Sequence, residues 1–219
     1  MNKCIRCKKN DCKNNYKFAV CKVTFLDDIC TIEKSVKTEN EVRKLFKDNN
    51  LFDKSEFETY KSHSEFIVPM IKEILERNKL NVSNLNEIIV VNGPGSFTGT
   101  RLGVTDAKML AYTLNIPIKT ITSIEAIALS VPEQDKIVCI SDNKGKYIGE
   151  FKDNKLIKDI YYIKNDLVEE LFSNTKDKVY IDQKIDLDKI SNQLSTLNPV
   201  NVHLANPIYI KTIEALSDK

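Results

Sequence analysis

The cysteines near the N-terminus have the spacing closest to that of a metal site. Cys4, Cys7 and Cys12 give the pattern C-x2-C-x4-C, and two thiolates two residues apart are a common pair of zinc ligands. A closed zinc site needs four ligands, and a second well-spaced pair is missing, because Cys21 and Cys30 fall in a strand-like segment. We therefore expect scattered thiols and no bound metal, with structural zinc as the alternative.

A hydrolytic triad can also be assembled from the sequence, from Ser96, His63 and Asp106. Its nucleophile would be expected in a G-x-S-x-G turn, which the chain lacks. A metal pair on a helix would need a second ligand four residues after His63, where Ile67 stands. We expect Ser96 to be a cap or turn residue and His63 to belong to a helix start. No residue is therefore predicted to be catalytic.

Glycine is concentrated at one predicted strand-to-helix turn. The chain has six glycines, and four of them lie within residues 93–103. Glycine costs roughly 0.5–1 kcal/mol in regular structure, so this density indicates a geometric need, with Ser96 or Thr98 as the helix cap. Amides at such a turn could bind an anion, but neither G-x-x-x-x-G-K-[ST] nor G-x-G-x-x-G occurs. The residues of this signature turn are Gly93, Pro94, Gly95, Ser96, Phe97, Thr98, Gly99 and Arg101.

The helix expected after the turn has small residues at every fourth position. These are Gly99, Gly103, Ala107 and Ala111. They share one face, which another helix could approach closely. Two interpretations stay open, packing within the chain's own domain and an interface with another subunit. We expect the interface to include an apolar stripe of the helix predicted at 62–79 as well, formed by Ile67, Met70, Ile71 and Ile74.

Helices and strands alternate along most of the chain, which favours an α/β fold. A hairpin with its turn at Asp27 and Asp28 is predicted for 17–36. Residues 39–60 look loosely helical, as an insertion or a peripheral helix, and Ser62 and Glu65 form a capping box for the helix at 62–79. Further helices are expected near 98–114, 123–130 and 165–172, and strands near 87–91, 117–121, 137–141, 147–151, 178–181 and 200–204.

Residues 92–128 resemble the signature stretch of the TsaB (YeaZ) family. The family pattern runs roughly G-x-GPGSFTG-x-R-x-G-x-x-x-AKGLA, then IP, then S-x-EA, and the chain reads NGPGSFTGTRLGVTDAKMLAYTLNIPIKTITSIEAIA. Upstream, the sequence HSE at 63–65 matches the family's HSE helix start. Downstream, DNKGKY at 142–147 resembles D-A-R-x-G-E-V-Y, and NPIYIK at 206–211 resembles the closing P-x-Y-L-R.

This resemblance implies the actin-like ATPase superfold, a two-lobed and ribonuclease-H-like α/β fold. The first lobe would be 1–115, with an insertion at 39–60, and the second 116–219, with 206–219 packing back on the first. The family also implies a non-catalytic partner subunit in tRNA threonylcarbamoyladenosine formation. Such a subunit supports a TsaD-type transferase together with a TsaE-type ATPase, meets tRNA indirectly, and could form a homodimer when alone.

The N-terminus departs from the family pattern. The family opens with a strand and an acidic D-T-S turn, which CIRCKKND at 4–11 does not match. Active members of the superfold need a glycine-containing phosphate loop and an acidic residue at this turn. We therefore expect a remodelled first lobe and no cofactor bound by this chain alone. A stand-alone ATPase or kinase-like enzyme of the same superfold is the alternative.

Composition sets the remaining limits. The 219 residues are 42% hydrophobic, enough for one large domain or two small lobes. A net charge of +2 provides no overall basic field for nucleic acid, so another subunit would supply most of any grip on RNA. No apolar run approaches the roughly 18 residues that span a bilayer, and no apolar stretch follows the charged N-terminus. We expect a cytoplasmic protein with reduced thiols.

Overall fold

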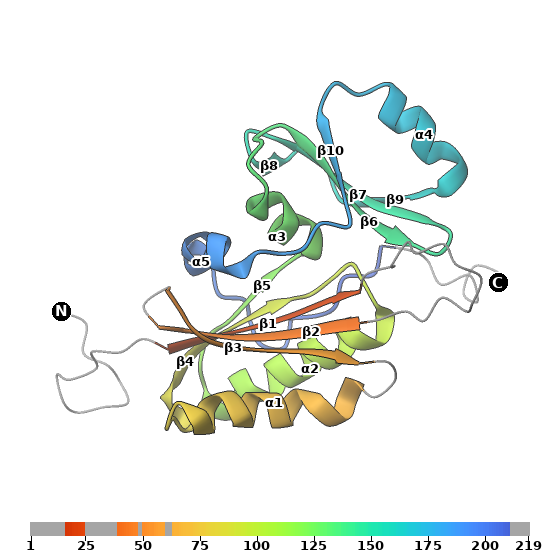
Figure 1. The fold of residues 1–219 in the computed structure, drawn as a ribbon. Coiled ribbons are helices and arrows are strands. Elements are labelled where there is room, and N and C mark those ends of the chain that lie inside the picture. Colours follow the sequence, from red (N-terminus) through yellow and green to blue (C-terminus); the bar gives the residue numbers. More distant parts are fainter. Residues whose placement is uncertain (1–15, 25–38, 48–49, 60–62, 211–219) are drawn as a thin grey trace.

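The computed structural model describes residues 16–24, 39–47, 50–59 and 63–210 of the chain (Figure 1). Side chains are described for 44–47, 50–54 and 68–210. The chain folds into two lobes, each built on its own β-sheet, and helices pack on both faces of each sheet. Within the described part, no helix combines the length and apolar character needed to cross a membrane.

The sheet of the first lobe has five strands in the order β3-β2-β1-β4-β5. Strand β2 is antiparallel to both β1 and β3, whereas β4 runs parallel to both β1 and β5. The strands are β1 (Tyr16–Thr24), β2 (Glu39–Lys47), β3 (Asn50–Thr59), β4 (Leu85–Val91) and β5 (Ile118–Ile121). The parallel strands are joined by helical crossovers, as parallel pairing requires.

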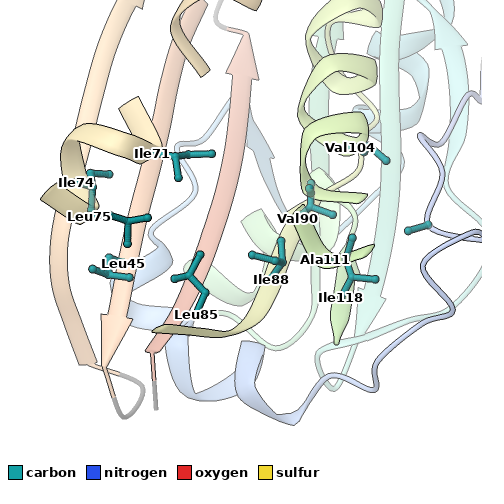
Figure 2. Close-up of a cluster of buried hydrophobic side chains, with 12 residues drawn as sticks. Leu45, Ile71, Ile74, Leu75, Leu85, Ile88, Val90, Val104, Ala111 and Ile118 are labelled. Atoms are coloured by element: carbon teal, nitrogen blue, oxygen red, sulfur yellow. The ribbon is translucent and has the colours of Figure 1, made fainter. Parts of the chain in front are cut away.

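Helices α1 (His63–Arg77) and α2 (Phe97–Leu114) cover one face of this sheet (Figure 1). Figure 2 shows the core beneath them, where Ile74 of α1 lies near Leu45 of β2. In the same cluster, Ala111 of α2 lies near Ile88 of β4 and Ile118 of β5. The neighbouring Ile89 faces the other side and belongs to the core beneath α5. Alternate residues of a strand point to opposite faces, so a strand covered on both sides is apolar throughout, as β4 is from residue 88 to 91.

Helices α3 (Ser123–Ser130) and α5 (Leu187–Thr196) lie between the two sheets (Figure 1). Ile190 of α5 packs with Ile89 of the first sheet. Ile127 of α3 packs with Val138 of the second sheet. The two helices therefore supply the apolar contacts that join the lobes.

The second sheet has the order β10-β6-β7-β8, and β9 also pairs with β7. Its strands are β6 (Lys136–Asp142), β7 (Gly145–Lys152), β8 (Lys155–Leu156), β9 (Tyr161–Lys164) and β10 (Lys178–Ile181). Helix α4 (Asn165–Ser173) covers the outer face, where Leu171 and Phe172 pack against Cys139 and Ile148. The lobes together form layers in the order helices, sheet, helices, sheet, helix.

The prediction of a helical insertion at 39–60 is wrong, because residues 39–47 form β2 and residues 50–59 form β3. Leu45 and Phe46 are adjacent and both buried, yet Leu45 belongs to the core under α1 and Phe46 to the core under α5. Neighbouring side chains on opposite faces indicate a strand buried on both sides. The segment is thus an integral part of the first sheet. The antiparallel partner of β1 is β2, and the predicted turn at Asp27 and Asp28 lies outside the described residues.

Most other predicted elements are present within a residue or two. Helix α3 has the predicted bounds, whereas β8, β9 and α5 were not predicted. The strand expected at 200–204 is instead a turn with a single bridge from Val200 to Ile118. The capping residue Ser62 lies outside the described residues.

The lobes divide later in the chain than residue 115, because β5 belongs to the first sheet. After α5 the chain also returns to the first lobe as a C-terminal strap, residues 200–210. Val200 donates a backbone hydrogen bond to Ile118 at 2.9 Å, and Ile208 donates one to Asn92 at 2.8 Å. Residues 211–219 lie outside the described part of the chain.

Candidate functional site

The signature turn needs glycine at its first position. Gly93 has φ +101°, in the left-handed region that other residues rarely adopt. A Cβ atom added there would lie 3.2 Å from Thr100 Cγ2 and 3.3 Å from the carbonyl oxygen of Ile208. Both the backbone conformation and the close approach of the C-terminal strap therefore exclude a side chain.

Ser96 caps helix α2, as predicted. Its Oγ accepts a hydrogen bond from the backbone N–H of Gly99 at 3.4 Å, and its carbonyl accepts one from Thr100 at 2.9 Å. The helix ends at Asn115, whose φ of +50° gives the left-handed conformation typical of a helix C-terminus. Ser96 thus serves the local structure and is not placed as a nucleophile.

Asn92 ties the turn to the C-terminal strap. Its backbone carbonyl accepts from Ile208, and its Nδ2 donates to the carbonyl of Asn206 at 3.2 Å. Its backbone N–H donates to Ile121 of β5 at 3.0 Å, and the carbonyl of the next residue, Gly93, accepts from Ser123 of α3 at 2.8 Å. The turn is therefore fixed by β5, by α3 and by the strap.

Side chains of α2 also hold the strap. Lys108 Nζ donates to the carbonyl of His203 and to Asn206 Oδ1, both at 3.2 Å. Arg101 Nε donates to Tyr209 Oη at 3.3 Å, and its guanidinium lies 4.6 Å from the centre of the Phe97 ring. The signature motif and the closing motif, far apart in the sequence, therefore meet in one place.

The small residues of α2 lie in the core of the chain itself. Gly99, Gly103, Ala107 and Ala111 are all buried, with Ala107 and Ala111 at 0% and 1% exposure. Met70, Ile71 and Ile74 of α1 are also buried. A buried side chain cannot touch a partner, so the contact predicted for these seven residues is corrected to packing within the first lobe. The side chain of Ile67 lies outside the described residues.

The outer surfaces of the same two helices form a groove. It has a volume of about 280 Å³. Val68 and Met109, on opposite sides of the groove, are each 54% exposed. The groove is lined by Val68, Ile71, Lys72, Leu75, Glu76, Leu80, Asn81, Val82, Asp106, Met109 and Leu110. An apolar centre with charged side chains beside it is the usual composition of a protein interface.

The structure does not bring a hydrolytic triad together. Ser96 caps α2 and Asp106 lies ten residues further along the same helix, about 15 Å away along its axis. The side chain of His63 lies outside the described residues.

Metal ligands are likewise not gathered in the described part of the chain, where no group of three or more His, Cys, Asp or Glu residues could hold an ion. Cys4, Cys7 and Cys12 lie outside it. Cys139 is fully buried, and burial raises the pKa of its thiol to about 12, so it stays protonated and unreactive.

Strand β1 occupies the centre of the first sheet, between β2 and β4. Residues 4–11, which were compared with the family's opening strand and turn, lie outside the described residues. Its parallel pairing with β4 ends where Val20 lies opposite Val90. Strand β1 continues to Thr24 in antiparallel pairing with β2. Residues 25–38, which follow it, contain no glycine and lie outside the described residues.

Sequence reasoning missed the outer groove and the contacts of the strap. Met109 and Tyr112 gave a weak signal, since both are large apolar residues on the helix side opposite its small face. The contacts of Arg101 and Lys108 with the strap join residues 95 to 108 positions apart, which no local pattern could indicate.

Comparison with known proteins finds a matching family model and curated relatives. A family model described as TsaD, tRNA N6-adenosine threonylcarbamoyltransferase, matches residues 57–209, more than half of the chain. The chain is 33% identical over 119 residues to the tRNA threonylcarbamoyladenosine biosynthesis protein TsaB of Bacillus subtilis, covering 53% of this chain and 49% of that protein. These matches confirm the resemblance carried by the signature stretch.

Two shorter sequence matches are to a second TsaB and to a transferase. The TsaB of Escherichia coli is 31% identical over 68 residues, or 31% of this chain and 29% of that protein. The tRNA N6-adenosine threonylcarbamoyltransferase of Legionella pneumophila is 36% identical over 70 residues, or 32% and 21%. The chain thus spans about half the length, or less, of the curated relatives that it matches.

The solved structure of YeaZ from Pseudomonas aeruginosa is similar over 89% of this chain and 99% of that chain, with a TM-score of 0.67 and 14% identity. At 14% sequence identity, this similarity is evidence about the fold alone. Together with the layer order, it confirms the predicted actin-like ATPase fold.

Proposed function

The chain belongs to the family of proteins described as TsaD, tRNA N6-adenosine threonylcarbamoyltransferase, and from this premise we propose that it is a non-catalytic partner subunit in tRNA threonylcarbamoyladenosine formation. Its partner is a transferase of the TsaD type. The TsaB names of its curated relatives support the pathway. The groove between α1 and α2 is the observation that carries the partner role.

The groove suits a helix of another protein. Helices α1 and α2 form its two sides. Its lining residues Val68, Val82 and Met109 are exposed to solvent although all three are apolar. Each square ångström of apolar surface removed from water contributes about 25 cal/mol. A helix that packs between two other helices buries this apolar surface, because its ridges of side chains fit into the grooves between theirs.

The transferase is a suitable occupant because it is related to this chain. A relative with the same fold has its own pair of helices at the corresponding place. Two such pairs can pack face to face, each contributing the same surface. The same geometry allows two copies of this chain to pair when the transferase is missing, so homodimer and heterodimer would compete for one surface.

The lack of catalysis is supported by the end of β1. An active ATPase or kinase of this superfold needs a glycine-containing phosphate loop directly after this strand, whereas residues 25–38 contain no glycine. We therefore infer that the chain binds no nucleotide by itself. A TsaE-type ATPase would join the assembly of this chain and the transferase, and most RNA contacts would come from the transferase.

Reconstitution of the modification tests this function. Purified TsaD-type and TsaE-type subunits from the same organism, ATP, the threonylcarbamoyl donor and an unmodified tRNA transcript should form little product until this chain is added. The chain alone should hydrolyse no ATP. Steady ATP hydrolysis by the chain alone would support the stand-alone enzyme, and full product without the chain would exclude a required partner role.

A further inference from the structure

The flank of α2 that holds the C-terminal strap bears partly exposed aromatic rings. Phe97 and Tyr209 lie 5.2 Å apart between ring centres and are 47% and 48% exposed. Further along the helix, the rings of Tyr112 and His203 meet at 5.6 Å, and Tyr112 is 67% exposed. Aromatic rings of this size are usually buried, so two exposed pairs on one flank indicate a binding surface.

Arg101 contacts both rings of the Phe97 and Tyr209 pair. Its Nε donates to Tyr209 Oη, and its guanidinium lies over the Phe97 ring. Within the described residues, no carboxylate forms an ion pair with Arg101, in contrast to Arg77, which pairs with Asp53 and Glu73. The hydrogen bond uses one of five N–H donors, so the terminal nitrogens can bind a phosphate in two-pronged geometry.

The remaining charge on the flank is also positive. Lys108 lies between the two ring pairs and holds His203 and Asn206 of the strap. Asp106 of the same helix lines the groove on the opposite flank. Arginine, lysine and exposed aromatic rings, the described side chains of this flank, are the composition that binds single-stranded RNA, through stacked bases and phosphate contacts.

We propose that this flank, formed by Phe97, Arg101, Lys108, Tyr112, His203 and Tyr209, contacts an unpaired segment of the substrate tRNA directly. Arg101 binds a phosphate, and the exposed rings stack on bases. The contact is local, which agrees with a net charge of only +2. The inference rests on the proposed function, which supplies tRNA as the substrate, and it replaces the expectation that the chain meets tRNA only indirectly.

RNA fits this surface better than a second protein does. The groove on the other flank is lined mainly by aliphatic side chains. This flank combines rings with Arg101 and Lys108, and no carboxylate of the described residues forms an ion pair with either cation. A protein partner would need acidic residues opposite Arg101 and Lys108. The RNA backbone, in contrast, supplies one negatively charged phosphate at every nucleotide.

The affinity of the assembled complex for an unmodified tRNA transcript tests the proposal. Arg101→Ala and the double variant Phe97→Ala/Tyr209→Ala should each weaken binding roughly five- to a hundred-fold. Lys155→Ala is the matched control, because it removes one exposed positive charge in the second lobe and should leave the affinity within about twofold. The slope of log affinity against log salt should fall by about 0.7 for Arg101→Ala.

Tyr209→Phe separates stacking from positioning. It keeps the ring but removes the hydroxyl that accepts from Arg101, so its loss of affinity should be smaller than that of Tyr209→Ala. If the double variant melts early, Arg101→Ala decides the test alone, since the exposed guanidinium supports only one hydrogen bond.

Two results would overturn the proposal. One is a tRNA affinity and salt slope unchanged by Arg101→Ala. The other is loss of the transferase from Arg101→Ala complexes, which would make the flank a protein-docking surface. Failure of the wild-type chain to join the transferase would count against the proposed function itself.

Discussion

Lys119 of β5 and Glu87 of β4 form an ion pair of 2.8 Å on the inter-lobe face of the first sheet. Their side chains are only 6% and 11% exposed, and Lys119 Nζ also donates to the carbonyl of Ser195 in α5 at 2.8 Å. Buried ion pairs gain little over apolar residues of similar size, but removal of one partner leaves the other charge buried and unpaired.

Lys119→Met should therefore lower the free energy of unfolding by roughly 3–5 kcal/mol. The double variant Lys119→Met/Glu87→Leu should recover most of that loss, because no buried charge remains. Urea denaturation of the three proteins measures both values. A double variant as unstable as Lys119→Met would show that the loss comes from packing against α5.

Gly93→Ala should destabilise the chain by about 1–2 kcal/mol or more, because φ is +101° and the strap lies 3.3 Å from the added Cβ. Gly95→Ala is the matched control in the same turn. A Cβ there would meet only Thr100 Oγ1, at 3.6 Å, an ordinary contact. Equal melting temperatures for the two variants would mean that the turn conformation is not required.

Lys136 should make stability depend on pH. It is fully buried at the start of β6, where its Nζ donates to the carbonyl of Ala128 at 2.5 Å and to Asn154 Oδ1 at 2.7 Å. Burial lowers its pKa below 10.5, the value of an unperturbed lysine. Between the folded pKa and 10.5 the unfolded chain binds more protons, so stability rises with pH in that window.

Lys136→Met lacks this titration. The stability of wild type relative to Lys136→Met should therefore increase as pH rises toward 10.5, measured by urea denaturation at successive pH values. A difference that stays constant or shrinks with rising pH would contradict a lowered pKa.

Ala111→Trp should unfold or strongly destabilise the chain, because Ala111 is 1% exposed on the side of α2 that packs in the core of the first lobe. Overpacking a core costs roughly 1–3 kcal/mol and often more. Tyr112→Trp, one residue later and 67% exposed, should melt as wild type does. A well-folded Ala111→Trp protein would place this residue at the surface and restore the interface first predicted for the small face.

The sequence was sufficient for most of the fold because its periodic patterns are local. The buried β4, the cap at Ser96 and the end of α2 at Asn115 each follow from neighbouring residues. The segment 39–47 was misjudged because Val42, Leu45 and Phe46 fit helical spacing as well as a strand covered on both faces. Pairing with β1 on one side and β3 on the other selects the strand.

The site was harder to predict than the fold. The spacing of Gly103 and Ala107 indicates close packing but cannot say whether the neighbour is the same chain or another. Here the neighbour is the first sheet. The groove depends on Val68 and Met109 facing outward together, and the contact between α2 and the C-terminal strap depends on Arg101 meeting Tyr209 across the fold. Both are long-range consequences of topology.

The most direct test of the partner role is the affinity of the purified chain for a TsaD-type subunit from the same organism. Met109→Asp puts a charge in the groove, at a side chain that is 54% exposed. Ile157→Asp is the matched control, because it puts the same charge at a side chain of the second lobe that is 53% exposed. Burying an unpaired charge at the interface should cost roughly 2 kcal/mol or more, about thirtyfold in Kd. We expect tight binding by wild type and Ile157→Asp, and at least thirtyfold weaker binding by Met109→Asp at an unchanged melting temperature. No binding by wild type, or equal binding by Met109→Asp, would contradict the partner role assigned to the groove.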